Sequence, residues 1–218
     1  MSEPSGAAAL LPPRATYDGT YRRVLEAALE LFADRGYHGV SMRDLAAAAG
    51  IRASSLYSHV PSKERLLYDL VLLGHEEHRA LIRQALLEAG DDPADQLRAV
   101  MRGHVLMHAA YPTLATVCNN ELHVLDGTAL DAVLAIRRDA EDTIAAVIER
   151  GVRLGRFDCP DTWLAAAAIG AMGIRVAAWF PHHPAAARYG VDDVADRYAE
   201  LALRIVGAIG ATISAPVG

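Results

Sequence analysis

The sequence is poor in cysteine, in lysine and in long apolar runs. Cys118 and Cys159 are its only cysteines among 218 residues. Their number and separation suit neither a disulfide framework nor a zinc knuckle, so we expect reduced thiols in a cytoplasmic protein. Lys63 is the single lysine among 21 basic residues. The longest stretch without a charged side chain, 103–120, contains histidine, asparagine and proline, which makes it a poor membrane segment.

Several motifs are missing as well. We find no sustained alternation of apolar and polar residues, which would indicate strands, and no glycine-rich phosphate loop. The first residues lack the basic and then apolar layout of a signal peptide. Residues 1–13 are rich in alanine and proline and are predicted to be a disordered leader. The sequence therefore predicts an all-α protein with no cofactor and no membrane partner.

What the sequence has in quantity is apolar residues, 52% of the total, which is enough for a substantial core. Apolar spacing and helix-breaking residues predict about nine helices. Their ranges are about 17–34, 42–49, 52–60, 63–89, 94–110, 112–125, 127–154, 161–180 and 191–209. We expect a small N-terminal three-helix domain at 14–66 and a larger helical domain at 67–218.

Charge is unevenly distributed between these two regions. The chain carries a net charge of −6. Residues 14–66 hold eight basic and six acidic side chains, whereas residues from 67 onward hold thirteen and twenty. A slightly basic N-terminal domain on an acidic body is compatible with DNA binding at one end.

Two short helices joined by a glycine turn predict a helix-turn-helix within the N-terminal domain. Ser41 and Asp44 have the spacing of a capping box at the start of the first short helix. Gly50 suits the positive φ of the turn. The second short helix is the one that would enter the major groove of DNA. Its outer face is small and hydroxylated, and it contains Ser54, Ser55, Tyr57 and Ser58.

The run LEAALELFADRGYHGVSMRDLAAAAGIRASSLYSHVPSKERLL, which covers about a fifth of the chain, resembles the DNA-binding segment of the TetR (tetracycline repressor) family. The resemblance implies a homodimeric transcriptional regulator, expected to be a repressor, that binds a palindromic double-stranded DNA operator. It implies that Ser41 and Arg43 contact the DNA backbone or a base. Base contacts would come from Arg52, Ala53 and Ser55, and phosphate contacts from Tyr57, His59 and Lys63. Ser58 is added because it lies on the same outer face.

The sequence departs from the family pattern at three positions. Arg52 replaces a usual serine or threonine, which would favour guanine, since arginine pairs well with guanine O6 and N7. Ser54 replaces glycine or proline, and Val60 replaces phenylalanine in the core. Simpler roles stay open. Tyr57 and His59 could be packed aromatic side chains, and Arg43 could pair with Asp44 or Glu64. Arg52 could be a solvated charge, and Ser62 and Lys63 could do no more than start a helix.

The C-terminal region has fewer motifs. The segment from Ile148 to Phe157, followed by an alanine-rich helix and Trp179, resembles the branch of the family that regulates fatty-acid and steroid breakdown. That resemblance implies a small apolar or acyl-CoA-like effector that releases the DNA. We expect its pocket to mix apolar and polar side chains from Met101, Val105, His108, Cys118, Asn119, His123, Arg175 and Trp179. Arg175 is predicted to be buried beside an anion, either Glu121 or Glu141 or the ligand itself.

Two C-terminal helices carry apolar or small residues at helical spacing. We expect them to form a four-helix bundle between two subunits, through Ala167, Ala171, Val194, Tyr198, Leu201 and Ile205. The alternative is that this stripe faces the core of its own subunit.

Histidine pairs at 75/78, 104/108 and 182/183 lack a His-Glu-x-x-His signature, so no metal site is predicted. A helical enzyme is the rival class, and its candidate residues are His104, Cys118, Glu121 and His123. The sequence contains neither a nucleophile elbow nor a triad spacing, so we expect no enzymatic activity. A helical adaptor without DNA binding is the third possibility.

Overall fold

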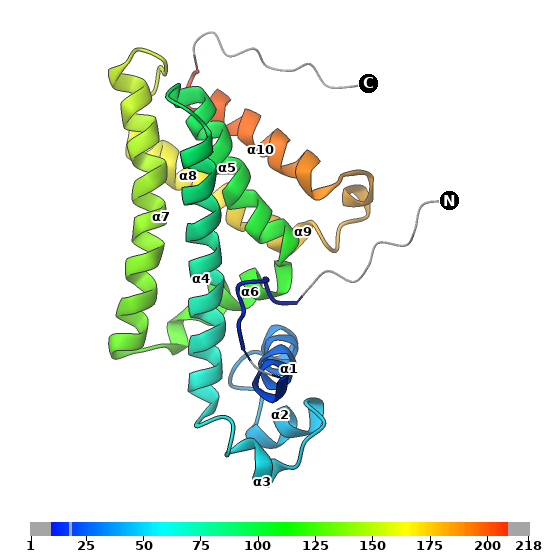
Figure 1. Cartoon of the computed structure of the whole chain (residues 1–218). Helices are drawn as coiled ribbons and strands as arrows, with labels where there is room; N and C mark the ends of the chain where they lie inside the picture. Colours follow the sequence, from blue (N-terminus) through cyan, green and yellow to red (C-terminus); the bar gives the residue numbers. More distant parts are fainter. Residues whose placement is uncertain (1–9, 18, 209–218) are drawn as a thin grey trace. The chain divides into compact units, whose positions relative to one another are not determined.

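The computed structural model describes residues 10–17 and 19–208, and these residues are helical apart from turns and one isolated bridge between Phe157 and Ala208. The elements are α1 Gly19–Arg35, α2 Met42–Ala48, α3 Ala53–Leu56, α4 Lys63–Glu88, α5 Pro93–Ala110, α6 Pro112–Asn120, the 3-10 helix η1 Leu122–Val124, α7 Gly127–Arg153, α8 Thr162–Ile174, α9 Val176–Trp179, the 3-10 helix η2 Pro184–Arg188 and α10 Val191–Ile205 (Figure 1). The all-α prediction is confirmed.

Four predicted helices have different limits. The helix expected at 191–209 ends at Ile205, and residue 209 lies outside the described residues. The helix expected at 52–60 is an α-helix only over Ala53–Leu56, because residues 58 and 59 bond to carbonyls three residues back. The helix expected at 161–180 divides at Arg175 into α8 and α9. The helix expected at 112–125 ends at Asn120, and η1 follows.

The chain forms two compact units. Unit 1 contains the described residues up to Glu77 together with Ala110–Ile136, and unit 2 contains His78–Ala109 together with the described residues from Arg137 onward. The boundary expected at 66/67 differs from this division, because α4 and α7 each contribute residues to both units. Each unit is described separately below.

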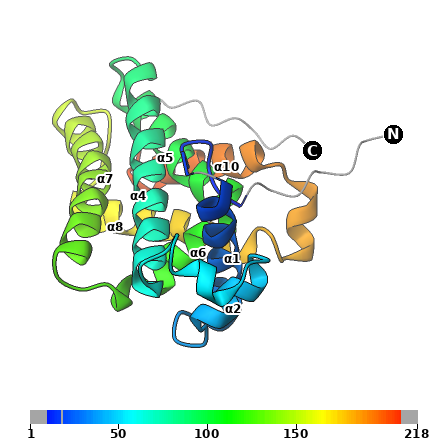
Figure 2. The same ribbon diagram turned by 60° about the horizontal axis from the view of Figure 1, so that its bottom comes forward.

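Unit 1 is organised around the apolar face of α1. Val24, Ala28 and Phe32 are almost fully buried, as their spacing predicts. α1 packs against α2 and α6, and Figure 2 shows α1 and α2 side by side. Leu66 and Leu70 on α4 complete this core, since both are fully buried. These contacts hold the short helices α2 and α3 in place.

The leader prediction fails for the residues just before α1. Leu11, within the predicted leader 1–13, is 2% exposed, and Ala15, just after that leader, is 3% exposed, so this segment packs into the unit rather than lying in solvent. Arg14 Nε pairs with Glu77 Oε2 at 3.0 Å, and Arg22 donates to the Ala15 carbonyl. The prediction rested on alanine and proline content, and composition alone does not indicate that Leu11 is buried. Residues 1–9 lie outside the described residues.

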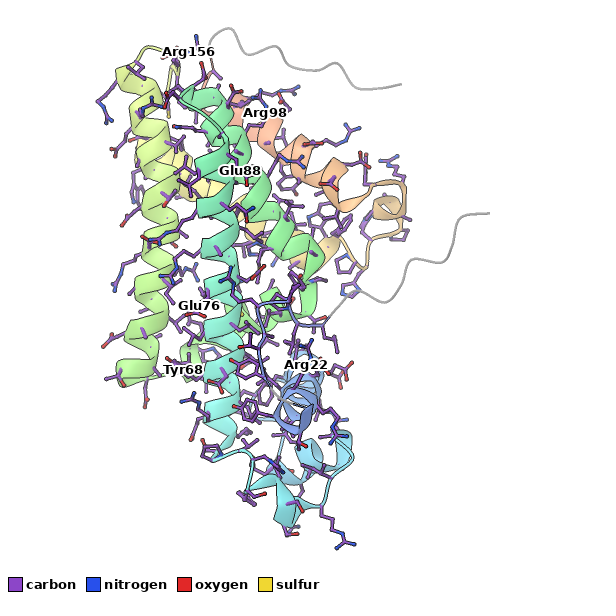
Figure 3. The ribbon with its side chains drawn as sticks, in the orientation of Figure 1. Arg22, Tyr68, Glu76, Glu88, Arg98 and Arg156 are labelled. Carbon is purple, nitrogen blue, oxygen red and sulfur yellow. The ribbon has the colours of Figure 1, made fainter. Side chains whose placement is uncertain are left out.

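Unit 2 has a separate apolar core. It is formed by α5, α7, α8 and α10, with Leu97, Ile148, Ile169 and Ala199 fully buried. Ion pairs link elements of this unit. Arg98 on α5, labelled in Figure 3, binds the Glu200 carboxylate on α10 at 3.1 Å. Arg156, also labelled, binds Asp92 at 2.7 Å.

Candidate nucleic-acid interface

The helix-turn-helix has the predicted local structure, both at the start of α2 and in the turn between α2 and α3. The Asp44 backbone N–H donates to Ser41 Oγ at 3.2 Å, and the Ser41 N–H donates to Asp44 Oδ2 at 2.8 Å, which completes a capping box. Hydrogen bonds from Ser41 lower the pKa of the Asp44 carboxyl, so it stays ionised at the helix N-terminus. Gly50 adopts φ 68°, which a residue with a side chain rarely adopts.

This local structure separates buried residues from exposed ones. Leu45, Leu56 and Val60 are buried. The side chains expected at DNA are all exposed apart from Lys63: Ser41, Arg43, Arg52, Ala53, Ser55, Tyr57, Ser58 and His59. Tyr57 is 62% exposed, so packing does not account for its position. His59 is exposed too, which removes the simple packing role considered for it.

Two guanidinium groups stand on this surface without carboxylate partners. Among the described residues, Arg43 and Arg52 form no ion pair, whereas Arg22, Arg35 and Arg65 each do. The Asp44 carboxylate is occupied by Ser41, so the predicted alternative of an Arg43–Asp44 pair is not what the structure has. Both cations are therefore available to a polyanion.

Lys63 differs from its expected role as an exposed phosphate contact. Its Nζ donates to the carbonyls of Tyr37 at 2.9 Å and Val40 at 2.8 Å. It also lies 4.0 Å from the centroid of the Tyr37 ring, a cation–π arrangement. Two of the three ammonium donors are thus used within the protein. Lys63 holds the loop between α1 and α2, a role that depends on tertiary placement and that its sequence position did not indicate.

A second polar group that the sequence analysis missed links α1 to α4. The Tyr21 hydroxyl donates to Asp69, whose buried carboxylate also binds Arg65 at 3.0 Å. Burial and the Asp69 hydrogen bond raise the pKa of Tyr21, so it remains a donor. Since α1 and α4 flank the helix-turn-helix, this network supports the surface without belonging to it.

The residues expected to line the effector pocket are divided between the two units. Met101, Val105 and His108 are buried in unit 2, where Trp179 is partly buried with its ring centroid 6.4 Å from that of Tyr198. The remaining residues Cys118, Asn119 and His123 belong to unit 1. A cavity of about 220 Å³ in unit 1 lies elsewhere, between α1 and α6.

The prediction that Arg175 is a buried cation is wrong. Arg175 is exposed where α8 ends, and its backbone caps that helix. Among the described residues it pairs with neither Glu121 nor Glu141, and Glu141 binds Arg137 instead. An apolar sequence neighbourhood suggested burial, but this helix leaves much of its apolar surface in solvent.

The predicted subunit-contact residues also separate into two groups. Val194 is 3% exposed and belongs to the core of unit 2. For this residue the alternative prediction is correct, namely that the stripe faces the core of its own subunit. Ala167 and Ala171 are exposed, and Leu201 and Ile205 are each 41% exposed. The sequence analysis missed two exposed residues at the start of α8, Trp163 and Leu164.

By length and composition, the helical stretch Thr162–Trp179 could cross a membrane, although only 28% of it is buried.

We call the exposed residues Trp163, Leu164, Ala167, Ala171, Leu201 and Ile205 the α8–α10 apolar surface. The helices α8 and α10 are in contact within unit 2.

The residues considered for the rival enzyme class do not form one site within either unit. His104 belongs to unit 2, whereas Cys118, Glu121 and His123 belong to unit 1. Burial raises the pKa of the Cys118 thiol to about 12, which leaves no nucleophilic thiolate at neutral pH.

Two family models together match most of the described chain. Residues 24–70 match the family model described as bacterial regulatory proteins of the tetR family, and residues 90–206 match the model for a tetracyclin repressor-like C-terminal domain. The HTH-type transcriptional repressor KstR2 of Rhodococcus jostii is 28% identical over 140 residues, which is 64% of this chain and 68% of that protein.

Solved structures have the same fold. A tetR-family regulatory protein from Rhodococcus RHA1 matches with a TM-score of 0.80 and 33% identity, over 88% of this chain and 99% of that one. AibR, solved in complex with isovaleryl coenzyme A and operator DNA, matches with a TM-score of 0.74 and 24% identity, over 87% and 100%. At that identity, AibR shows the fold alone.

Proposed function

This chain belongs to the TetR family of transcriptional regulators, which are not enzymes, and we propose that it is a cytoplasmic repressor that binds a palindromic operator as a homodimer. Its contacts with DNA come from α2, α3 and the residues that follow α3. A small apolar or acyl-CoA-like molecule releases it from the operator.

The exposed, unpaired guanidinium groups of Arg43 and Arg52 on the helix-turn-helix carry this proposal. The side chains of Ser55, Tyr57 and Ser58, on and just after α3, are exposed too, and their hydroxyl groups suit phosphate oxygens or base edges. Ala53 adds little bulk, so the start of α3 can approach the floor of the major groove. In this proposal, Arg52 reads a guanine, since arginine pairs with guanine O6 and N7.

An electrophoretic shift assay with the DNA upstream of the gene tests operator binding. We expect a specific complex whose affinity falls as salt rises, because phosphate contacts release counterions. Arg43→Ala should weaken that complex. Arg153→Ala is the matched control, since it removes one exposed arginine from α7. Equal loss in both variants, or no complex with wild-type protein, would contradict the proposal.

The α8–α10 apolar surface supports the homodimer. Its residues Trp163 and Leu164 are 75% and 58% exposed, and such an apolar patch on a water-soluble chain indicates a protein contact. The small side chains of Ala167 and Ala171 allow a second copy of α8 to approach closely. A second copy of this chain is therefore the proposed partner, and sedimentation at micromolar concentration should report a dimer.

Unit 2 is the proposed effector-binding region. The resemblance of the segment from Ile148 to Phe157 to the fatty-acid and steroid branch supports an acyl-CoA-like ligand here. Isovaleryl coenzyme A, with which AibR was solved, is a suitable first probe. Binding would shift the population away from the DNA-competent state, with a typical coupling of about 1–3 kcal/mol. Isovaleryl coenzyme A should raise the melting temperature and release the DNA. Release by neither this thioester nor longer acyl thioesters would contradict the effector class.

A further inference from the structure

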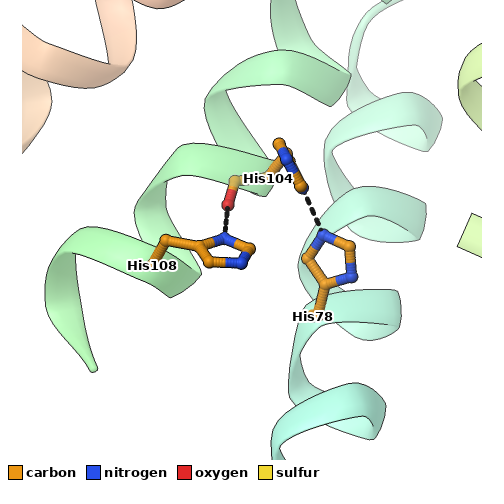
Figure 4. A group of neighbouring side chains, drawn as sticks. All are labelled: His78, His104 and His108. Carbon is orange, nitrogen blue, oxygen red and sulfur yellow. Dashed lines mark hydrogen bonds between the residues drawn. The ribbon is translucent and has the colours of Figure 1, made fainter. Parts of the chain in front are cut away.

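Three histidines from two helices meet inside unit 2 (Figure 4). His78 lies on α4, and His104 and His108 lie one turn apart on α5. Each residue offers a ring nitrogen, and these nitrogens all lie within 4.8 Å of one another. His78 Nε2 is 2.6 Å from His104 Nδ1. His104 and His108 are 3% and 4% exposed, so the cluster is largely shielded from water.

Backbone carbonyls fix which nitrogens of two rings carry a proton. His104 Nε2 lies 2.9 Å from the Gly170 carbonyl oxygen, which can only accept, so Nε2 carries the hydrogen and Nδ1 keeps its lone pair. His108 Nδ1 lies 2.8 Å from the His104 carbonyl oxygen, so its Nε2 keeps the lone pair. Metal-binding histidines typically donate their other ring N–H in this way.

The packing of α8 against His104 keeps its ring in place. A Cβ added at Gly173 would come within 2.1 Å of the His104 ring, so α8 accommodates this side chain only because it has glycine there.

We propose that His78, His104 and His108 bind one Zn²⁺ ion through His78 Nε2, His104 Nδ1 and His108 Nε2, with a fourth position left to water or an anion. Three imidazoles without a thiolate suit zinc, and three protein ligands with an open position are typical of exchangeable rather than structural sites. His78 contributes by moving its ring proton from Nε2 to Nδ1, so no net proton is gained or lost in that ring.

The rings need only small movements to bind the ion. Zn–N bonds of about 2.0–2.1 Å in a tetrahedral arrangement place ligand nitrogens about 3.3 Å apart. The observed 2.6 Å between His78 and His104 must widen, and the longest separation, at most 4.8 Å, must shorten. Both changes are on the order of 1 Å, which side-chain rotation supplies. The sequence analysis missed the site because its third ligand, His78, lies on another helix.

Zinc titration of the full-length protein against a chromophoric chelator tests the site. We expect one Zn²⁺ per chain, and Co²⁺ should give the visible absorption of a tetrahedral nitrogen site. His108→Asn keeps an amide donor for the His104 carbonyl but removes the Nε2 ligand. His78→Gln keeps a side-chain donor but removes the imidazole. Each variant should bind zinc about 100-fold more weakly or worse.

His182→Asn is the control, because it removes an exposed histidine outside the cluster and should leave zinc affinity unchanged. Helicity and melting temperature of each variant are measured first, and where one fails to fold, the other decides. Zinc binding below one ion per chain in wild-type protein, or binding unaffected by both substitutions, would overturn the proposal. The readout involves no DNA, so a failed zinc site and a failed operator remain distinguishable.

Discussion

Two exposed surfaces of the molecule differ in chemistry. The surface of α2 and α3 presents arginine, serine, tyrosine and histidine above a few buried leucines and valines. The α8–α10 apolar surface presents tryptophan, leucine, isoleucine and alanine above a large core. Polar groups left without partners suit a charged, hydrated ligand, whereas apolar groups left in water suit another protein surface. Exposure alone is therefore uninformative until the kind of side chain is considered.

The largest expected effect tests the apolar surface. The double substitution Leu201→Asp with Ile205→Asp would place charges inside the proposed dimer contact, where desolvation costs about 3 kcal/mol or more. The dissociation constant of the dimer should rise at least about 100-fold. Because both side chains are 41% exposed within one subunit, helicity should be retained. Sedimentation measures the change, and Ala146→Asp, at an exposed position of α7, is the control. A stable dimer in the double variant would refute the contact.

The next effect separates the inner from the outer side of α8. Gly173→Ala forces a methyl group into the His104 ring and should destabilise the protein by about 2–3 kcal/mol. Gly170→Ala meets nothing within 4 Å and should stabilise α8 by up to about 1 kcal/mol. Urea denaturation at fixed protein concentration measures both. Similar midpoints for the two variants would show that His104 is not held tightly against α8.

A smaller effect concerns base recognition by the polar surface. Arg52→Ala should cost about 1–2 kcal/mol and relax preference at one base position, since its guanidinium is expected to read guanine. Tyr57→Ala should weaken binding to all sequences equally, because a phosphate contact carries no sequence information. Competition binding with operators substituted base by base distinguishes the two. Relaxed preference in Tyr57→Ala alone would reverse these roles.

The smallest effect concerns the support of the polar surface. Ser41→Ala removes the side-chain cap of α2 and should lower the free energy of unfolding by about 1 kcal/mol. Ser54→Ala, at an exposed position in α3, should change stability by less than about 0.5 kcal/mol. Thermal denaturation measures the difference between them. Equal melting temperatures would mean that the capping box contributes little.

The same two surfaces show which structural features could be predicted from the sequence and which could not. The cap at Ser41, the positive φ at Gly50 and the exposure of the α3 face follow from neighbouring residues, so local spacing predicted them. The side of α10 that faces the core was harder, because Val194 and Leu201 belong to one apolar stripe and only the packing of unit 2 separates them.

Long-range contacts account for the remaining differences. The histidine cluster needs α4 beside α5, and the burial of Leu11 needs the folded unit 1. Arg175 is the opposite case. Its apolar sequence neighbourhood predicts a buried cation, but the side chain is exposed. Sequence pattern identifies a face, but it does not identify what covers that face.

The position of Lys63 gives the protein a chemical reporter. It is the only lysine in the chain, so reagents that acylate amines can modify just this side chain and the α-amino group. Its ammonium is held by the Tyr37 and Val40 carbonyls, which should slow acylation for as long as the loop between α1 and α2 is intact. Mass spectrometry of acylated peptides would then follow local opening of the helix-turn-helix at one residue, without a label or an introduced cysteine.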